Sequence, residues 1–176
     1  DRLTLAVAGT HGKTTTSSLA AHILYSAGKN MAAFLGGIVK GYESNLLVTD
    51  NVNQDTIMVI EADEFDRSFL HLHPQVAIVT TVDPDHLDTY GDEPGFQEAF
   101  KAFIALVPPT GKAIVHQIAA QQLRIDENAP HVVRYALEDA AVSAENVRIK
   151  EGTFYFDYVS KEVTIRNLRL TVPGYH

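Results

Sequence analysis

The sequence predicts an α/β protein with three layers, in which helices flank a mostly parallel sheet of the phosphate-loop type, followed by a C-terminal antiparallel β meander. Three observations lead to this prediction. Short apolar runs typical of buried strands alternate with helical segments between residues 3 and 135. A glycine-containing turn joins the first apolar run to the first helical segment. The last segment of the chain instead alternates polar and apolar residues with period two.

The chain begins with a strand, a turn and a helix. Residues 3–8 (LTLAVA) are apolar and long enough for one buried strand. Residues 9–13 form a turn, after which apolar side chains recur at helical spacing from Thr14 to Ala27. Gly28 follows where a helix commonly ends, so the helix is expected to stop there.

The next strands run into glycine or acidic segments. Residues 31–35 are expected to form a strand that leads into two glycines, and residues 40–55 a loop or a β excursion. Residues 56–60 and 76–80 are apolar and are expected to form buried strands. The first of these leads into EADE and the second, after a short connection, into DPDH. Because parallel strands present their carboxyl ends at one edge of the sheet, both acidic segments should lie near the turn at residues 9–13.

The middle of the chain contains one strongly amphipathic helix. Apolar side chains recur at helical spacing from Phe96 to Val107, and two prolines then stop the helix. Residues 113–116 and 132–135 are expected to form two further strands on either side of a helix near residues 117–123.

The end of the chain has the pattern of antiparallel strands. Residues 146–170 (NVRIKEGTFYFDYVSKEVTIRNLRL) alternate with period two. Turn residues interrupt the pattern at 151–152 and at 160–161. The segment therefore predicts a three-stranded meander.

The composition narrows the possible function classes. The chain has no cysteine, which excludes disulfides and thiolate metal sites. A formal charge of −8 disfavours nucleic acid and anionic membranes as partners. No apolar run reaches the ~20 residues that span a bilayer, and no signal peptide is visible. We therefore expect a cytoplasmic protein, with an upstream segment missing because the sequence starts at Asp1.

The turn after the first strand resembles a phosphate-binding loop. Residues 7–14 (VAGTHGKT) match the pattern G-x-x-x-x-G-K-[ST], except that Val7 replaces the first glycine. Backbone N–H groups at a helix N-terminus favour anions. Lys13 could reach the β- and γ-phosphates, and the Thr14 hydroxyl could bind Mg²⁺. An ordinary glycine-rich turn is the alternative, but the strand before it and the helix after it favour a nucleotide site. The residues expected to bind the nucleotide are Gly9, Thr10, His11, Gly12, Lys13, Thr14 and Thr15.

A carboxylate at the end of the next buried strand is a candidate metal ligand. Glu61 directly follows residues 56–60, so it should face the phosphates, and hard cations prefer carboxylate oxygens. Alone, this acidic junction would be interpreted as an ordinary loop. Beside a phosphate loop, Glu61 becomes a metal candidate. The neighbouring acidic residues are interpreted as solvated or as holding the loop: Asp63, Glu64 and Asp66.

A histidine follows the second of these strands. His86 should reach the same edge of the sheet, and a neutral imidazole can bind a metal ion. Spacing alone supports a structural or exposed histidine equally well. Asp85 and Asp88 are alternative metal ligands at this edge.

Four motifs together resemble one known family. GTHGKTTT, EADEFDRSFLHLHP, DPDHLDTYGD and a final PGYH occur in the order found in the central ATP-binding domain of the Mur ligases. The resemblance covers almost the whole chain, and that family also uses the shortened loop. It implies that residues 1–176 are a fragment of this domain, without the UDP-sugar domain before it or the amino-acid domain after it. PGYH resembles the start of a segment that leads to the adenine, so adenine-contacting residues are expected beyond His176.

The resemblance also implies an activity. It is strongest with the branch that joins L-alanine to the lactyl carboxylate of UDP-N-acetylmuramate through an acyl phosphate, with ATP and Mg²⁺, in peptidoglycan precursor synthesis. The implied catalytic residues are Lys13, Glu61 and His86. The implied metal ligands are Thr14 and Glu61, with His86 on a second Mg²⁺, and Ser68 is implied to lie near the substrate. The isolated chain is expected to ligate nothing.

Three other functions compete with this interpretation. A ligase that attaches a whole tripeptide to the same UDP-sugar shares the EADE and DH elements. A non-catalytic ATP-binding module would not need the second metal ligand. A kinase or motor-type NTPase shares only the loop. Sister ligases carry a carbamylated lysine where Phe103 falls, with Lys101 nearby, and its absence favours the alanine-adding branch. The oligomeric state is not predicted.

Overall fold

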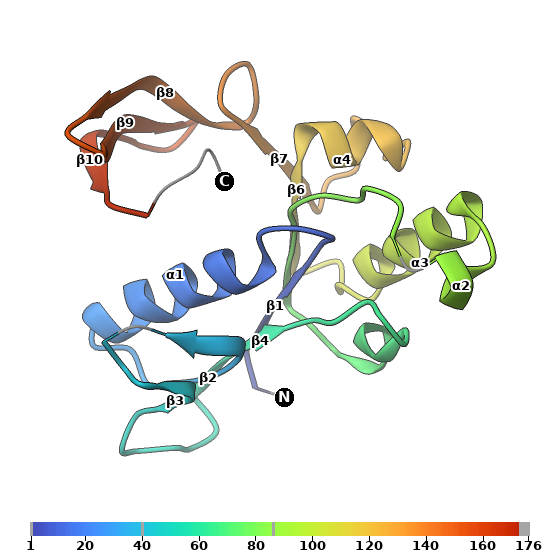
Figure 1. Cartoon of the computed structure of the whole chain (residues 1–176), viewed down its shortest axis with the longest axis horizontal. Helices are drawn as coiled ribbons and strands as arrows, with labels where there is room; N and C mark the ends of the chain where they lie inside the picture. Colours follow the sequence, from blue (N-terminus) through green and yellow to red (C-terminus); the bar gives the residue numbers. More distant parts are fainter. Residues whose placement is uncertain (1, 40, 86, 173–176) are drawn as a thin grey trace.

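The computed structural model describes residues 2–39, 41–85 and 87–172, and its backbone is one ten-stranded mixed sheet with helices on both faces (Figure 1). The strand order is β10-β9-β8-β7-β6-β5-β1-β4-β2-β3. The strands are β1 (Thr4–Ala8), β2 (Met31–Val39), β3 (Ser44–Val48), β4 (Ile57–Glu61), β5 (Val76–Val79), β6 (Lys112–His116), β7 (Val132–Ala136), β8 (Val142–Lys150), β9 (Thr153–Ser160) and β10 (Thr164–Leu170). The helices are α1 (Lys13–Ser26), α2 (Leu87–Tyr90), α3 (Glu93–Ala105) and α4 (Gln117–Gln122), with a 3₁₀ helix η1 (Ser68–His71).

The middle of the sheet is parallel and its two ends are antiparallel. β1 lies between β4 and β5 and is parallel to both. The parallel pairing continues through β6 and β7 to β8, whereas β3, β9 and β10 pair antiparallel with their neighbours. α1 lies on one face, and α3 and α4 lie on the other (Figure 1). The predicted three-layer α/β architecture with a C-terminal meander is confirmed. None of the helices in the described ranges is long and apolar enough to cross a membrane.

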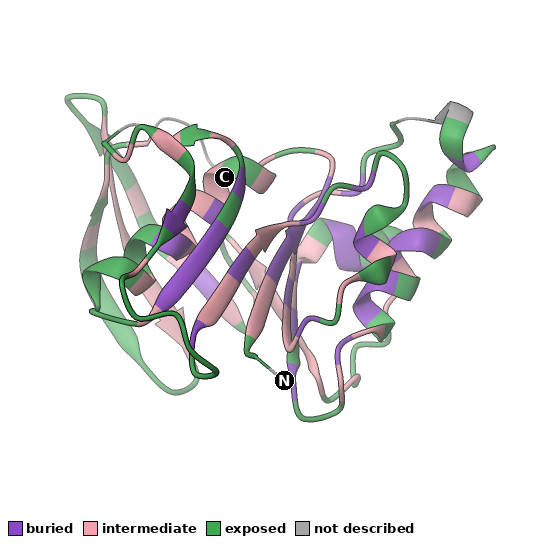
Figure 2. Cartoon of the chain, turned by 90° about the horizontal axis from the view of Figure 1, so that it is seen from below, coloured by how far each residue is buried: buried purple, intermediate pink, exposed green. Residues whose placement is uncertain are grey.

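Two hydrophobic clusters hold the layers together, one on each face of the sheet. Ala6 and Ala8 of β1 belong to the cluster beneath α3 and α4, whereas Leu5 packs on the α1 side. This alternation follows from the period of two in a strand. Buried residues accordingly concentrate along the central strands in Figure 2. The aromatic stripe of α3 fills the larger cluster, with Phe69 stacked on Phe103 at a ring separation of 5.1 Å.

The two ends of α1 differ in their chemistry. At the start, Gly12 is the N-cap, has φ 82°, and supplies no side-chain cap. The first N–H groups of α1 are therefore not occupied by a cap and point toward the loop. At the end, Gly28 has φ 66°, its N–H donates to the Tyr25 carbonyl, and the Lys29 N–H donates to the Leu24 carbonyl. These two bonds form a Schellman motif, which confirms the predicted stop at Gly28.

The structure adds strand residues to the prediction at β2 and β8 and adds two short helices. β2 passes through Gly36 and Gly37 to Val39, and residues 40–55 contain the β excursion as β3. β8 begins at Val142 rather than at residue 146 and joins the meander to the parallel sheet through β7. The short helices η1 and α2 were not predicted. The PGYH segment, residues 173–176, lies outside the described residues, which end at Val172.

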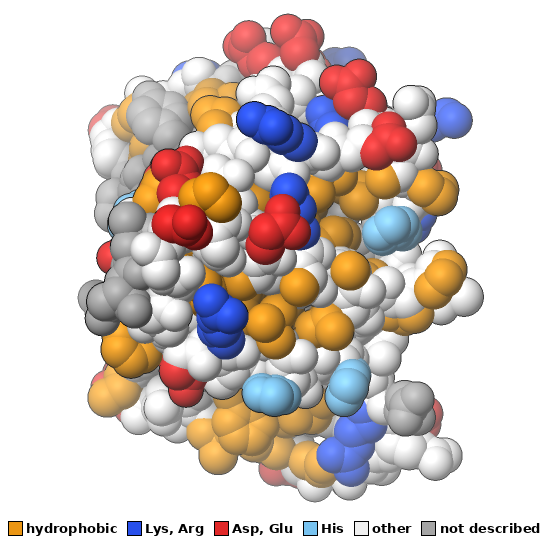
Figure 3. Space-filling view, turned by 90° about the vertical axis from the view of Figure 1, so that its right-hand side faces the viewer, with side chains coloured by type: hydrophobic (Ala, Val, Ile, Leu, Met, Phe, Trp, Pro, Cys, Tyr) orange, Lys and Arg blue, Asp and Glu red, His pale blue; other side chains and the backbone are white. Residues whose placement is uncertain are grey.

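The face that carries α3 and α4 has a mixed surface. Figure 3 shows acidic and basic side chains on this face, interspersed with hydrophobic atoms. Lys101 of α3 donates to Glu98 at 2.7 Å, as expected for an exposed helical pair one turn apart. Phe103, two residues further on, is fully buried.

Candidate functional site

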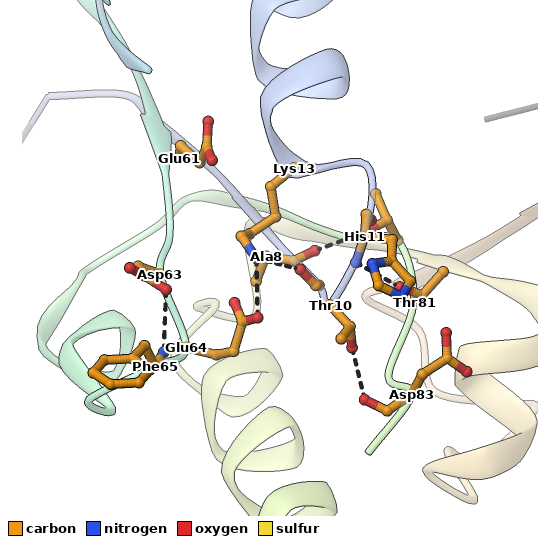
Figure 4. A network of polar contacts seen from close by, with 12 residues as sticks. Ala8, Thr10, His11, Lys13, Glu61, Asp63, Glu64, Phe65, Thr81 and Asp83 are labelled. Carbon is orange, nitrogen blue, oxygen red and sulfur yellow. Dashed lines mark hydrogen bonds and ion pairs between the residues drawn. The ribbon is translucent and has the colours of Figure 1, made fainter. Parts of the chain in front are cut away.

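The loop between β1 and α1 is tied to the segment that follows β5. The Thr10 N–H donates to the Thr81 carbonyl at 3.1 Å, and the His11 N–H donates to Thr81 Oγ1 at 2.9 Å. The Thr10 hydroxyl donates to the Asp83 carbonyl at 2.9 Å (Figure 4). These three hydrogen bonds fix the shape of the loop.

Glycine at position 9 is required by geometry. Gly9 has φ 139°, and a Cβ placed there would lie 2.0 Å from Thr80 Oγ1 and 2.9 Å from the Thr81 nitrogen. Val7, by contrast, is fully buried inside β1 and pairs with Glu61 and Ile78 in the strands on either side. The loop begins only after β1 ends, so the position that Val7 occupies does not need a glycine.

Lys13 lies at the first position of α1 and points back across the loop. Its Nζ donates to the Gly9 carbonyl at 2.7 Å and to Glu64 Oε1 at 2.9 Å (Figure 4). An ammonium has three donors, and two of those of Lys13 are used within the described residues, which leaves the third without a described partner. The side chain of Lys13 is 16% exposed, so this third donor can be reached from the loop.

Glu64 is a site residue that the sequence analysis missed. Its side chain is 2% exposed, and its Oε2 accepts no hydrogen bond from the described residues. Buried carboxylates are costly unless they are paired, and here the pair is Lys13. EADE contained Glu64, but a loop has no periodicity from which the direction of a side chain could be inferred.

Glu61 and Thr14 are brought together as the sequence predicts. The Thr14 hydroxyl donates to Glu61 Oε1 at 2.9 Å. Glu61 Oε2 accepts from the Gly36 N–H at 2.7 Å and from the Ser17 hydroxyl at 3.4 Å. A hydroxyl and a carboxylate at this separation are oxygen donors of the kind that Mg²⁺ prefers. The donor set at the end of β4 therefore fits a magnesium ion.

His86 lies outside the described residues, but the segment after it is described. Tyr90 ends α2, and its hydroxyl donates to the backbone carbonyl of Glu64. The guanidinium of Arg67 lies over the Tyr90 ring, 4.8 Å from its centroid. Burial, and secondarily the Glu64 carboxylate, raises the pKa of Tyr90 to about 12. The segment that follows His86 is thus packed against the residue that pairs with Lys13.

Ser68 makes its hydrogen bonds within its own loop. Its N–H donates to Asp66 Oδ1 at 2.9 Å, and its hydroxyl donates to the Asp63 carbonyl at 3.4 Å. Hydrogen bonding from the Ser68 side chain, and secondarily from its backbone N–H, lowers the pKa of Asp66. Ser68 is exposed, and none of these bonds reaches Lys13, Thr14 or Glu61.

A cavity of about 270 Å³ lies beside the loop. Its lining combines loop and helix residues with the carboxyl ends of neighbouring strands: His11, Gly12, Thr16, Thr80, Thr81, His116, Tyr135, Ala136, Leu137 and Ala144. Burial lowers the pKa of His116 and raises that of Tyr135 to about 12, so both rings are neutral near pH 7. A second groove, of about 580 Å³, adjoins Thr15 on the other side of α1. Apolar, neutral surroundings next to backbone donors suit a ring attached to a phosphate.

Comparisons with known proteins agree with this geometry. Residues 7–176 match the family model described as the Mur ligase middle domain. A UDP-N-acetylmuramate–L-alanine ligase of Phocaeicola vulgatus is 46% identical over 169 residues, which are 96% of this chain and 36% of that protein. The chain therefore spans about a third of the length of this curated relative.

Solved structures share the fold. A UDP-N-acetylmuramate:L-alanyl-γ-D-glutamyl-meso-diaminopimelate ligase from Neisseria meningitides superposes with a TM-score of 0.78 at 25% identity, covering 99% of this chain and 56% of that one. A MurF ligase from Thermotoga maritima, solved in complex with ADP, superposes with a TM-score of 0.72 at 16% identity, covering 94% of this chain and 40% of that one. Because the family model matches nearly the whole sequence, the chain belongs to the Mur ligase family, of which it is a middle domain.

Proposed function

We propose that this chain is the ATP-binding part of a ligase that joins L-alanine to the lactyl carboxylate of UDP-N-acetylmuramate. The observation that carries the proposal is the meeting of Lys13, Thr14 and Glu61 at the carboxyl edge of β1 and β4. The name of the relative that is 46% identical supports the choice of substrates. The proposal covers the longer protein, of which this chain would supply the phosphate site.

In this proposal the nucleotide lies along the loop. The free N–H groups at the start of α1 and the third donor of Lys13 take the phosphates, because a helix N-terminus and an ammonium both stabilise negative charge. The nucleoside enters the cavity lined by His116 and Tyr135, which is continuous with loop residues His11 and Gly12. The ADP bound to the MurF structure of the same fold is consistent with this use of the fold.

Thr14 and Glu61 would hold a magnesium ion in this site. A bound Mg²⁺ there would neutralise charge on the phosphate oxygens. His86 is proposed as a ligand of a second metal ion, and Ser68 as a residue near the UDP-sugar substrate. Ser68 could take this role without a change in its surroundings, because the residue is exposed.

The reaction activates a carboxylate in two steps. A carboxylate oxygen of the substrate attacks the γ-phosphorus of ATP, the bond to the bridging oxygen breaks, and ADP leaves with an acyl phosphate formed. The neutral amine of L-alanine then attacks the acyl carbon, phosphate leaves, and the nitrogen loses a proton to give the amide. Lys13 contributes by stabilising the charge that moves onto the phosphate oxygens during the first step.

Two alternatives make different predictions. A tripeptide ligase of the kind solved from Neisseria meningitides would use the same carboxylate with a different amine. A non-catalytic ATP-binding module would bind nucleotide without forming an acyl phosphate. Phosphate release by the full-length protein distinguishes these functions. The protein is given UDP-N-acetylmuramate and ATP, with L-alanine in one reaction and the tripeptide in another.

The expected result is phosphate release that depends on L-alanine. Release only with the tripeptide would replace the alanine-adding activity with the recycling one. ATP binding without release in either tube would leave a binding module. The isolated 176-residue chain is expected to release no phosphate under the same conditions, and release there would contradict the assignment of both substrates to other parts of the protein.

The metal role of Glu61 has its own prediction. Glu61→Ala in the full-length protein should abolish turnover and leave the thermal midpoint close to that of the parent, because Glu61 is only half-buried. Circular dichroism melting and phosphate release measure the two effects. Glu98→Ala, which removes an exposed carboxylate on α3, is the control and should retain full activity. Near-normal turnover of Glu61→Ala would remove this residue from the metal site.

A further inference from the structure

The Gly36 N–H donates to the Glu61 side chain at the point where the backbone pairing between β2 and β4 ends. β2 and β4 pair in parallel from Met31 and Ile57 to Phe34 and Ile60. Two residues further along β2, the Gly36 N–H donates to the side chain of Glu61 at 2.7 Å. A backbone donor that would otherwise seek a strand partner is thus directed at the proposed metal ligand.

Both oxygens of this carboxylate are fixed from two different elements. Thr14 and Ser17 of α1 donate to Oε1 and Oε2, and Gly36 of β2 donates to Oε2. The contact from Gly36 is the shortest of the three. A hydrogen bond from a backbone N–H to a carboxylate is charge-assisted and about twice as strong as a neutral one.

There is no room for a side chain at position 36. A Cβ placed on Gly36 would lie 2.3 Å from Glu61 Oε1 and 2.7 Å from Glu61 Cδ. Neither Gly36 nor Gly37 is among the residues with positive φ, so the reason for glycine at position 36 is steric. A Cβ on Gly37 would meet only Thr14 Cγ2, at an ordinary distance of 3.6 Å.

From these contacts we infer that Gly36 is a positioning residue for the Glu61 carboxylate, acting through its N–H and through its missing side chain. The inference rests on the metal role proposed for Glu61. It adds that the β2–β3 hairpin, which carries none of the predicted site residues, sets the direction of a metal ligand on β4. A side chain at position 36 must displace the Glu61 carboxylate, because both of its oxygens would lie less than 3 Å from the added Cβ.

The test compares Gly36→Ala with Gly37→Ala in the full-length protein. We expect Gly36→Ala to raise the Mg²⁺ concentration needed for half-maximal phosphate release by about tenfold or more, as for the loss of a charge-assisted hydrogen bond. Gly37→Ala should stay within about twofold of the parent, because its Cβ meets only an ordinary contact. Binding of Mn²⁺ in the presence of ATP, followed by electron paramagnetic resonance, gives a readout independent of turnover.

A Glu61→Gln variant measured in parallel separates the two ideas. An unchanged metal requirement in Glu61→Gln would defeat the proposed metal role itself. A raised requirement in Glu61→Gln together with an unchanged one in Gly36→Ala would overturn the positioning role alone. Equal losses of activity and of thermal midpoint in both glycine variants would also overturn it, because they would indicate general damage to β2.

A second variant covers the case in which Gly36→Ala fails to fold. Gly36→Ala combined with Glu61→Asp withdraws the carboxylate by one methylene from the added Cβ. We expect this double variant to recover the parent's thermal midpoint, because the close contact is with the Glu61 side chain. Failure to recover would show that position 36 requires glycine for another reason.

Discussion

At the scale of residues, the ion pair between Lys13 and Glu64 joins the start of α1 to the segment that follows β4. Its carboxylate is 2% exposed and its ammonium 16%, so the pair is largely removed from water. Removing one member of a buried pair leaves a desolvated charge and costs much more than removing both. The pair therefore contributes to the stability of the fold, in addition to the phosphate binding that we propose for Lys13.

This arrangement predicts a strong non-additivity. Lys13→Met should lower the free energy of unfolding by about 3 kcal/mol or more, because Glu64 is left buried and unpaired. The double variant Lys13→Met/Glu64→Gln should recover more than half of the loss, since the orphaned charge is gone. Urea unfolding of the single and double variants measures both values. Lys101→Met, which breaks the exposed pair with Glu98, is the control and should cost about 1 kcal/mol or less. Additive losses would contradict the buried-pair argument.

The sequence could predict the part of the site that follows from strand ends and from the loop pattern. Lys13, Thr14 and Glu61 were placed together because a strand end and a helix start meet at one edge of a parallel sheet. Glu64 and Gly36 could not be found this way. Glu64 contributes to the site through the direction of its side chain in a loop, which places it on Lys13. Gly36 contributes through a backbone N–H from a strand that is distant in sequence.

At the scale of elements, the end of α1 depends on one left-handed residue. Gly28 has φ 66°, and no atom lies within 4 Å of the position its Cβ would take. A substitution there therefore tests backbone conformation without a steric contribution. An L-residue in this conformation costs about 1–2 kcal/mol, partly offset by the stiffer unfolded chain.

We expect Gly28→Ala to lower the free energy of unfolding by about 1 kcal/mol. Gly28→Asn should cost less, because asparagine enters the left-handed region more readily than alanine. Chemical denaturation with a constant m-value would show that only stability has changed. An asparagine variant less stable than the alanine variant would contradict the conformational explanation.

Element prediction succeeded where the chain has a clear apolar run or a helical repeat and failed where it has neither. The strands β1, β4, β5, β6 and β7 and the helices α1 and α3 have clear apolar patterns. α2 and η1 are four residues each, which is too short for any period to show. β2 continues through Gly36 and Gly37, although glycine normally weakens a strand. Two contacts support this part of β2: the antiparallel pairing of β2 with β3, and the hydrogen bond from the Gly36 N–H to Glu61.

At the scale of the whole molecule, two tyrosines with raised pKa values make the stability of the fold depend on alkaline pH. Tyr90 lies in α2 and Tyr135 in β7, and burial raises the pKa of each to about 12. The unfolded chain releases these protons near pH 10. A folded pKa above the unfolded one means that the stabilisation is complete below about pH 10 and is lost as the pH rises toward 12.

We therefore expect the thermal midpoint to fall between about pH 10 and 12 more steeply in the parent than in Tyr135→Phe. Tyr135→Phe is the better variant to compare, because the Tyr90 hydroxyl also donates to the Glu64 carbonyl. All other titratable groups are the same in both proteins, so the difference between the two curves isolates Tyr135. Superimposable curves would show that ionisation of Tyr135 does not affect folding.

The junction between the parallel sheet and the meander is narrow. Among the described residues, only two pairs join β7 to β8, namely Tyr135 with Val142 and Ala136 with Ser143. Beyond them, β8, β9 and β10 pair only with one another, and the β8–β9 turn is formed by Glu151 and Gly152, both with positive φ. An insertion or deletion at that turn would lengthen or shorten two strands without altering the register of any strand near the loop. Evolution could therefore reshape the meander for different neighbours while the loop and its acidic residues stayed the same.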